Sequence, residues 1–254
     1  MRSARKLLRR SARYREGMFL IEGPHCVTEA LESPVVVEEV FAVPGAPDGV
    51  VLAAGASNVP ITRVSDRVLR AVSESVTPQG VVAVAQLPRS ELDEVLPTDL
   101  VLVLAGVRDP GNAGTLVRSA VAAGAGAVVF AEESVDPYSG KVVRSSAGAL
   151  FRLPVVVESV SLRWADTLDK HDVAIVGADA GATQTLYEAD LTVPVAVVIG
   201  NEAWGLPGPV SARVGRSLRI PMPGPAESLN AAVAGSILLF EVVRRRLLES
   251  ASHG

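Results

Sequence analysis

The sequence of 254 residues has a single cysteine, Cys26, and only three histidines, which are scattered along the chain. One cysteine excludes an intramolecular disulfide, and these residues show no metal-site spacing, so we expect a protein without a structural metal. No apolar run approaches the roughly 18 residues that a membrane span needs. The N-terminal segment is basic and lacks the apolar stretch of a secretory signal. These absences favour a cytoplasmic protein that is not inserted in a membrane.

Aromatic residues make up only 4% of the chain, so stacking platforms for single-stranded nucleic acid are not available in quantity. The common fingerprints of nucleotide and hydrolase sites are missing as well. There is no GxxxxGK[ST], no GxSxG and no GxGxxG after the first strand, and Gly124–Phe130 (GAGAVVF) lacks the third glycine and leads into a strand. Asp179, after an apolar run, could be a ribose ligand, but a lone Asp in a loop is weak evidence.

Charge is unevenly distributed along the chain. Residues 1–15 contain seven basic side chains and no acidic one, so the rest of the chain carries −11 to give the formal net charge of −4. A basic arm over residues 1–16 suggests a polyanion contact confined to one part of the molecule. The alternative is a solvated helix in which Leu7 and Leu8 dock while the arginines face water.

The N-terminal part predicts a small α/β domain over residues 17–87, built on β-branched runs. Residues 88–98 are charged, contain two prolines and lie between strand-like runs, which is typical of a domain linker. In this part we expect strands at 18–22, 35–43, 59–63 and 80–86, and helices at 3–13, 24–31, 50–56 and 66–75.

The rest of the chain, residues 99–254, predicts a second and larger domain with longer α/β alternation. Runs such as VAVVIG are apolar throughout, which indicates a mainly parallel sheet with helices on both sides. We expect strands at 100–105, 127–130, 153–157, 173–177, 193–200 and 217–220. We expect helices at 113–123, 141–147, 161–170 and 207–214, followed by a C-terminal helix.

The C-terminal helix is predicted to begin at Ser228-Leu229-Asn230, after a loop rich in proline and glycine. Ser228 is a good N-cap, because its hydroxyl can accept from the free N–H groups of the first turn. Helical spacing predicts that one face is buried, with Leu229, Val233, Ile237 and Phe240 on it. Strand, tight loop and helix N-terminus together make a good pocket wall.

Three loops at strand ends carry unusual residues, and each has an ordinary alternative. AGVRDPGNAGTLVRSA places Asn112 at a helix start and Arg118 on its first turns, where an Asn cap and a surface Arg would also fit. VVIGNEAWGLP runs from a buried strand into Gly200-Asn201-Glu202, where backbone N–H groups can face a ligand and Gly200 allows close approach. The alternative there is a plain turn, and for Ser228-Leu229-Asn230 it is a plain N-cap.

In this order the three loops resemble motifs one, two and three of the SpoU/TrmH-type RNA ribose 2′-O-methyltransferases of the SPOUT superfamily. The motifs are Asn112 with Arg118, then Gly200 to Leu206 (GNEAWGL), then Ile220-Pro221 with Ser228-Leu229-Asn230. The resemblance spans roughly residues 100–246. The N-terminal part is similar to the family's substrate-binding domain, through FLIEGPHCVTEAL and TPQGVVAV.

The resemblance implies a C-terminal domain in which the chain is threaded into a deep trefoil knot, an exception to the rule against threading. It implies S-adenosylmethionine as the cofactor, a homodimer that completes the site, and an N-terminal domain of the ribosomal L30e-like type that grips folded RNA. By position, the residues that match the cofactor site are Gly200, Ile220 and Leu229, and the predicted set also includes Ala178 and Met222.

The polar residues that match the family's catalytic set are Asn112, Arg118, Glu202, Ser228 and Asn230. Arg118 corresponds to the proposed activator of the ribose hydroxyl, but a guanidinium stays protonated. Clamping a phosphate and stabilising alkoxide charge is a less demanding role. Glu202 would orient Arg118 or another donor. In motif two, Asn201, Ala203 and Trp204 stand where members of the family vary.

Within this family, the size and the N-terminal domain resemble most those of the ribosomal RNA enzymes, including enzymes that protect a producer from thiopeptide antibiotics. The resemblance thus implies ribosomal RNA as the substrate, with transfer RNA as the second choice. Two other classes of function stay open. A non-catalytic RNA-binding protein could retain the fold, although its motifs would then be expected to be damaged. A small-molecule α/β enzyme would use another nucleotide cofactor, and the missing fingerprints count against it.

Overall fold

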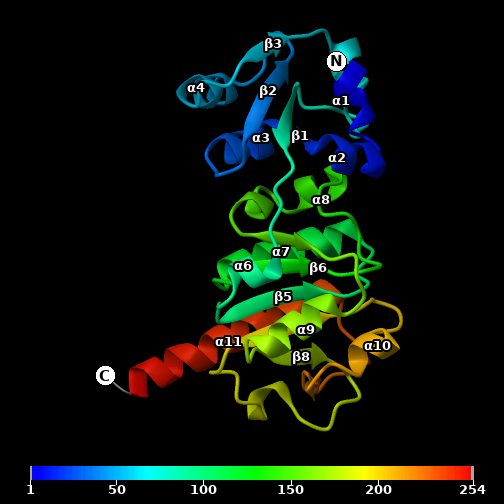
Figure 1. Cartoon of the computed structure of the whole chain (residues 1–254), viewed down its shortest axis with the longest axis vertical. Helices are drawn as coiled ribbons and strands as arrows, with labels where there is room; N and C mark the ends of the chain where they lie inside the picture. The colour runs from blue at the N-terminus through cyan, green and yellow to red at the C-terminus, as the bar shows by residue number, and fades with distance from the viewer. Residues whose placement is uncertain (1, 253–254) are drawn as a thin grey trace. The chain divides into compact units, whose positions relative to one another are not determined.

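The computed structural model describes residues 2–252 (Figure 1). Met1, at the start of the predicted arm, and His253 and Gly254, at the end of the predicted C-terminal domain, lie outside the described residues. The chain forms two compact units. The first comprises the residues up to Pro88 together with Asp136–Arg152, and the second comprises Arg89–Val135 together with the residues from Leu153 onward. The helical segment Asp136–Arg152 therefore packs with the N-terminal residues, although it follows the predicted linker in sequence.

The first unit is built on a four-stranded mixed sheet of order β1-β4-β2-β3. β4 runs antiparallel to both β1 and β2, and β2 runs parallel to β3. The strands are β1 (Met18–Glu22), β2 (Val37–Ala42), β3 (Ile61–Arg63) and β4 (Val81–Gln86). The helices are α1 (Arg2–Lys6), α2 (Arg10–Glu16), α3 (Pro24–Leu31), α4 (Asp48–Ala56), α5 (Asp66–Arg70), α8 (Gly140–Ser145) and the 3₁₀ helix η1 (Ala149–Phe151). All four strands predicted for this part of the chain are present.

The basic N-terminal segment differs from the prediction. The helix expected over residues 3–13 is interrupted, because α1 ends at Lys6 and α2 begins at Arg10. Arg13 is 4% exposed, and its guanidinium donates to the carboxylate of Asp136 and to the carbonyls of Leu7 and Leu8. The expectation that the arginines of this segment face water or a polyanion is therefore wrong for Arg13.

The second unit contains a six-stranded parallel sheet of order β10-β8-β9-β5-β6-β7. The α/β class and the mainly parallel sheet agree with the prediction. The strands are β5 (Leu100–Leu104), β6 (Ala127–Phe130), β7 (Val155–Val157), β8 (Ala174–Ala178), β9 (Val195–Ile199) and β10 (Arg216–Leu218). The helices are α6 (Leu92–Val95), α7 (Pro110–Ala122), α9 (Arg163–Lys170), the 3₁₀ helix η2 (Leu186–Glu188), α10 (Gly208–Ser211) and α11 (Ala231–Ser252).

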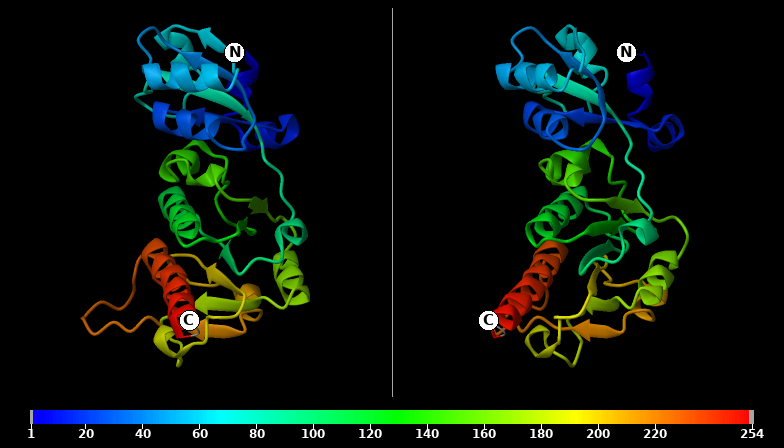
Figure 2. Two further views of the ribbon diagram at one scale, coloured as in Figure 1. Left: turned by 90° about the vertical axis from the view of Figure 1, so that its left-hand side faces the viewer. Right: turned by 60° about the vertical axis from the view of Figure 1, so that its left-hand side comes forward.

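Helices cover both faces of this sheet, as Figure 2 shows, with α7 and α11 on one side and α9 on the other. The strands β5 and β9 are buried along their whole length, which explains their continuous apolar sequences. Residues 88–98, predicted as a linker, contain the short helix α6. Leu92 and Leu96 of this segment belong to the hydrophobic core on the α9 side of the sheet. The segment is therefore partly built into the second unit.

The C-terminal helix α11 begins two residues later than predicted, at Ala231, and its cap is Asn230. The Oδ1 atom of Asn230 accepts from the N–H groups of Ala232 and Val233, at 2.9 and 3.3 Å. The prediction that Ser228 forms the N-cap is therefore wrong. An Asn side chain satisfies the first-turn donors as well as a Ser hydroxyl does, so the sequence offered two equivalent caps.

The face of α11 that is buried is also not the predicted one. Val233 and Phe240 are 47% and 48% exposed, and Leu229 is 37% exposed. The buried residues are instead Ala232, Gly235, Leu238, Leu239, Glu241 and Val242. The small residues lie where α11 packs on α7, because a Cβ atom at Gly235 would collide with the side chain of Leu116 and come within 3.0 Å of Ile199. Close packing on α7 therefore buries the face that carries Gly235 and leaves Val233 and Phe240 exposed.

Candidate functional site

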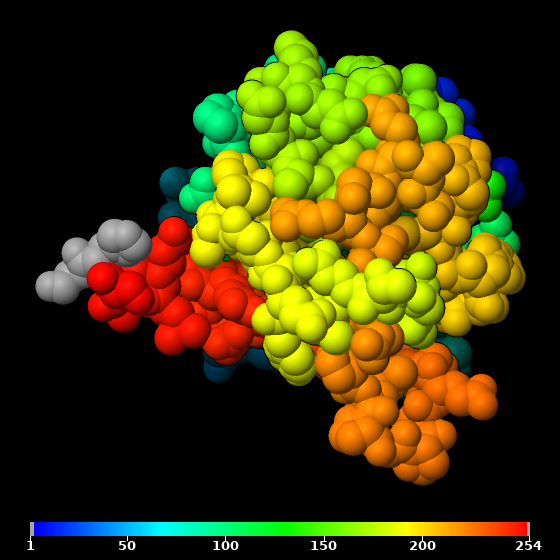
Figure 3. Space-filling view, turned by 90° about the horizontal axis from the view of Figure 1, so that it is seen from below, coloured from blue at the N-terminus to red at the C-terminus, as the bar shows by residue number. Residues whose placement is uncertain are grey.

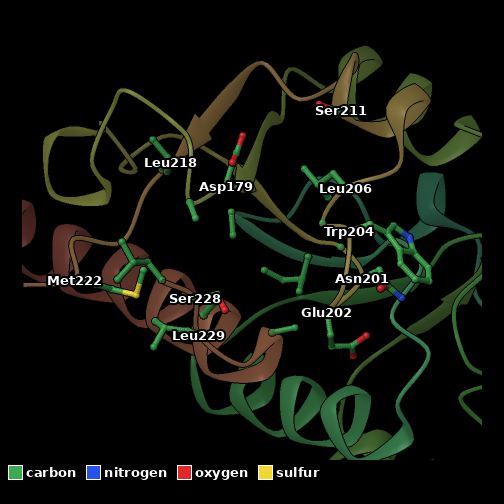
Figure 4. Close-up of a pocket in the computed structure, with 18 residues that line it drawn as sticks. Asp179, Asn201, Glu202, Trp204, Leu206, Ser211, Leu218, Met222, Ser228 and Leu229 are labelled. Atoms are coloured by element: carbon green, nitrogen blue, oxygen red, sulfur yellow. The ribbon is translucent and has the colours of Figure 1, made fainter. Parts of the chain in front are cut away.

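The carboxyl ends of β8, β9 and β10 meet around a cavity of about 390 Å³, within the second unit. Ligand sites of open parallel sheets lie at this edge, and the volume falls in the usual range for small-molecule pockets. The loop between β10 and α11 forms one wall of the cavity. Its exposed residues, coloured orange in Figure 3, project from the surface of the molecule. The loop after β9 forms the other wall. Figure 4 shows Met222, Ser228 and Leu229 on one side of the cavity and Asn201, Glu202 and Trp204 on the other.

The structure brings most of the predicted site residues to this cavity. The five residues assigned to the cofactor all line it, namely Ala178, Gly200, Ile220, Met222 and Leu229. Of the five assigned to catalysis, Glu202 and Ser228 line it directly. Asn112 donates a hydrogen bond to Glu202, and Asn230 donates one to Asn112, whereas Arg118 does not line the cavity.

The loop after β9 is closed on itself by backbone contacts at Gly200. The N–H of Asn201 donates to the carbonyl of Gly205 at 2.8 Å, and the N–H of Gly205 donates back at 2.9 Å. A Cβ atom at Gly200 would lie 2.7 Å from the backbone nitrogen of Leu206 and 2.5 Å from the carbonyl carbon of Gly205. We expected Gly200 to allow a ligand to approach. The close approach in the structure is that of the chain's own backbone, so Gly200 is required to form the loop.

Three polar side chains form a row beside the cavity. Asn230 Nδ2 donates to Asn112 Oδ1 at 3.0 Å, and Asn112 Nδ2 donates to Glu202 Oε1 at 2.8 Å. Asn112 is held in the first turn of α7, where its backbone N–H donates to the N-cap Asp109 at 2.7 Å. Asn112 is therefore not the cap of α7. The row connects the N-terminal ends of α7 and α11 to the loop after β9.

Arg118 stands apart from this row. It lies six residues after Asn112 on α7, which corresponds to about 9 Å along the axis and about 240° of rotation. Its side chain is exposed, and it makes no hydrogen bond or ion pair with the residues that the structure describes. Glu202 accepts a hydrogen bond from Asn112 rather than from Arg118. The guanidinium of Arg118 is thus free to bind another molecule.

Sequence reasoning missed the part that Asn201 plays in this site. Asn201 is 8% exposed, its Nδ2 donates to the carbonyl of Gly106 at 3.0 Å, and its Oδ1 accepts from the N–H of Ala203 at 2.8 Å. It therefore shapes the loop after β9 and ties it to the loop before α7. An Asn directly after a strand and a glycine is typical of such a turn, and this signal was available. Asp179, judged weak from sequence, also lines the cavity.

Among residues 2–252, no group of three or more His, Cys, Asp or Glu side chains is arranged to hold a metal ion. None of the helices in the same part of the chain combines the length and the hydropathy of a bilayer span.

Comparison with known proteins gives matches over nearly the whole chain. Residues 99–240 match the model of the SpoU rRNA Methylase family, and residues 1–83 match that of the MRM3-like substrate binding domain. The 23S rRNA (guanosine(2553)-2′-O)-methyltransferase RlmP of Bacillus subtilis (strain 168) is 34% identical, over 94% of this chain and 93% of the relative. The 23S rRNA (guanosine-2′-O-)-methyltransferase RlmB of Xylella fastidiosa (strain 9a5c) is 38% identical, over 75% of this chain and 80% of the relative.

Solved structures give the same picture. The SpoU methyltransferase AviRb from Streptomyces viridochromogenes, in complex with the cofactor AdoMet, matches with a TM-score of 0.86 and 30% identity. The match covers 97% of this chain and 98% of that protein. The AdoMet-bound rRNA methyltransferase from Sinorhizobium meliloti matches with a TM-score of 0.81 and 30% identity, over 96% of this chain and 93% of that one.

Proposed function

The chain belongs to the SpoU rRNA methylase family, and from this premise we propose that it transfers the methyl group of S-adenosylmethionine to a ribose 2′-hydroxyl of 23S ribosomal RNA. The single observation that carries the proposal is the cavity at the end of the parallel sheet. Its walls hold the residues expected to bind the cofactor, and the row of Asn230, Asn112 and Glu202 lies at its edge. A cytoplasmic location follows from a ribosomal substrate.

The residues that line the cavity suit S-adenosylmethionine. Ile220, Met222 and Leu229 supply apolar surface, while the loop after β9 supplies backbone groups next to Gly200. Asp179 brings a carboxylate, of which Oδ1 accepts from the N–H of Gly181 at 2.8 Å. Such a carboxylate can accept from ribose hydroxyls. The bound cofactor supplies an electrophilic methyl group on a sulfonium centre, so the chain's own task is to deliver an oxygen nucleophile in line.

The polar row and Arg118 have different roles toward the RNA. The amides of Asn112 and Asn230, with the hydroxyl of Ser228, position the ribose, and correct placement alone lowers the barrier substantially. Arg118 binds a phosphate next to the target ribose and stabilises the negative charge that develops on the 2′-oxygen. Glu202 fixes the orientation of the Asn112 amide through their 2.8 Å hydrogen bond.

A homodimer completes the site in this proposal. Arg118 lies outside the cavity of its own chain and has a free guanidinium, so it can serve the site of a partner. The exposed apolar face of α11, with Val233 and Phe240, offers a surface for the second copy. The trefoil knot of the SPOUT domain belongs to the same proposal, and the close match to solved SpoU methyltransferases supports it.

The N-terminal unit would bind the RNA outside the target nucleotide. The match of residues 1–83 to a substrate-binding domain supports this role and the proposed L30e-like type, with residues 17–87 as the domain proper. Since Arg13 is buried, phosphate contacts from the basic segment would come from exposed side chains such as Arg5, Lys6 and Arg9. The residues from 99 onward would form the methyltransferase domain, apart from Asp136–Arg152, which pack with the first unit.

The test is incubation with labelled S-adenosylmethionine and an unmodified 23S rRNA transcript, with assembled large subunits and total tRNA as parallel substrates. We expect label in ribosomal RNA, and mapping then identifies the nucleotide. Label in tRNA alone would mean that the substrate is tRNA rather than 23S rRNA. Binding of S-adenosylmethionine without transfer to any RNA would contradict the proposal. Arg118→Ala should abolish transfer while leaving cofactor affinity within about twofold, because Arg118 does not line the cavity. Loss of both would reject this division of roles.

A further inference from the structure

Trp204 presents most of its indole to solvent beside the site. The chain has two tryptophans, and the other one, Trp164, is fully buried in the core. Trp204 is 62% exposed, although it lines the cavity together with its neighbour Glu202. Large aromatic side chains contribute most when they are covered, so an exposed indole next to a polar site is available to pack against a bound molecule.

A positive charge accompanies the indole. The guanidinium carbon of Arg108 lies 5.3 Å from the centroid of the Trp204 ring, within the range of a cation–π contact. Arg108 is also paired with Glu133 at 2.7 Å, and both of these side chains are more than half exposed. The pair therefore keeps Arg108 in place without burying its charge, and the guanidinium can still reach an anion from solvent.

The two loops that carry these side chains are fixed to each other. Asn201 donates to the carbonyl of Gly106 in the Arg108 loop and accepts from the N–H of Ala203, next to Trp204. The backbone pair between Asn201 and Gly205 closes the turn around Trp204. The backbone that carries the indole therefore needs little reordering when a ligand binds, which is the benefit of preorganisation.

We propose that Trp204 and Arg108 form a nucleotide subsite for the RNA, in which the indole stacks on a base at or next to the target and Arg108 contacts its phosphate. Proteins that read unpaired RNA stack bases on aromatic rings and bind the adjoining phosphates with arginine. The subsite rests on the proposed function and gives it a contact for the base, which the polar row does not supply. Hydrogen bonds from Asn112 and Asn230 position the ribose, whereas stacking holds the base away from its neighbours.

The competing occupant is the adenine of the cofactor, since Trp204 lines the same cavity. Two features favour RNA. Most of the indole surface is open to solvent instead of enclosed in the cavity. The guanidinium of Arg108 next to the ring can bind a phosphate, a group that RNA carries and S-adenosylmethionine lacks.

Fluorescence separates the two occupants directly. Because Trp164 is buried, a change in emission on adding a ligand reports mainly on Trp204, and Trp204→Phe supplies the background. We expect an unmodified 23S rRNA transcript to quench wild-type emission and to leave Trp204→Phe nearly unchanged. S-adenosylmethionine alone should quench little. Equal quenching by the cofactor alone, or no quenching by RNA that binds, would overturn the subsite.

Kinetics give the second readout. Trp204→Leu should raise the KM for RNA by about 5- to 100-fold, the range expected for loss of one stacked base, whereas Trp204→Phe should stay within about threefold. Arg108→Ala should reduce the slope of log affinity against log salt by about 0.7 to 0.9, as for one lost phosphate contact. Tyr187→Leu, another exposed aromatic side chain of the same unit, is the matched control and should change neither value.

The outcomes distinguish this inference from the proposed function. If the wild-type protein transfers no methyl group to any RNA, the proposed function fails, and the fluorescence titration still decides whether a base stacks on Trp204. If the wild type is active and Trp204→Leu keeps its KM for RNA, the subsite is wrong and the function stands. A parallel loss of cofactor affinity in Trp204→Leu, measured by calorimetry, would assign the indole to the cofactor instead.

Discussion

Gly200→Ala tests whether the loop after β9 depends on the close approach of its own backbone. The added Cβ atom would fall 2.5 Å from the carbonyl carbon of Gly205 and 2.7 Å from the nitrogen of Leu206. Real Cβ atoms do not come so close to backbone atoms, which cannot rotate away as a side chain can. The loop must therefore move, and its two hydrogen bonds between Asn201 and Gly205 are lost or lengthened.

The cost of this movement can be worked out from its parts. Each backbone hydrogen bond contributes about 0.5–1.5 kcal/mol, and overpacking costs about 1–3 kcal/mol. Since two such hydrogen bonds are affected, we expect the free energy of unfolding to fall by about 2–6 kcal/mol. Because the loop forms one wall of the cavity, its movement also lowers the affinity for S-adenosylmethionine, by about tenfold for every 1.4 kcal/mol of binding free energy lost.

Urea denaturation and calorimetric titration of S-adenosylmethionine measure the two quantities side by side. Gly208→Ala is the matched control in the same segment, since no atom lies within 4 Å of the Cβ position there. It should bind the cofactor as the wild type does and unfold at the same or a slightly higher urea concentration. Wild-type stability and cofactor affinity in Gly200→Ala would refute the reasoning.

Three further predictions follow from the same contacts. Asn230→Asp should keep the cap of α11, and hence the melting temperature, but lower kcat, because the donor to Asn112 is lost; a fall in thermal stability equal to that of Asn230→Ala would argue against this separation. Arg13→Ala should lower the free energy of unfolding by about 3–5 kcal/mol, since it leaves the buried carboxylate of Asp136 without its ion-pair partner, whereas the exposed Arg9→Ala should change it by less than about 0.5 kcal/mol. Phe240→Asp should shift the protein from dimer to monomer in sedimentation velocity, and a monomeric wild type would exclude the proposed homodimer.

The strands of the second unit were predictable because their buried positions are occupied by continuous runs of apolar residues. β5, β6 and β9 consist almost only of apolar residues, and such runs have no good place except inside a covered parallel sheet. Loops at their carboxyl ends must then share one edge of the sheet. This geometry made Gly200 and Ile220 foreseeable as neighbours, and the three motifs supplied the remaining choice of residues.

The C-terminal helix shows where periodicity stops being informative. Apolar residues occur around most of α11, so the spacing of Val233 and Phe240 fits a buried stripe as well as that of Leu238 and Val242 does. The contact with α7 decides which of these two faces is buried. There, Gly235 leaves room for the side chain of Leu116, and the hydroxyls of Ser236 and Ser119 form a 2.7 Å hydrogen bond. A partner 117 residues away in sequence cannot be found from local spacing.

Arg13 illustrates a second limit, which concerns charge. Seven basic residues in fifteen read as a solvated segment, because a charged side chain is rarely buried without a partner. The partner is Asp136, 123 residues later, with Tyr14 donating to the same carboxylate at 3.0 Å. The sequence contains both residues but no local signal that they are in contact. Counting charge along the chain therefore predicted an exposed Arg13, which is wrong.

The polar row explains why amide side chains are needed at positions 112 and 230. Each must accept on one atom and donate from the other, and among the common side chains only Asn and Gln carry both groups in one plane. Asn230 accepts from the N–H groups of α11 and donates to Asn112, which in turn donates to Glu202. An Asp at position 112 would set two carboxylates against each other, so it should disturb the loop after β9 as well as the ribose contact. The row therefore couples the start of α11 to the wall of the cavity, so a substitution at Asn230 should alter the position of Glu202, and the reverse.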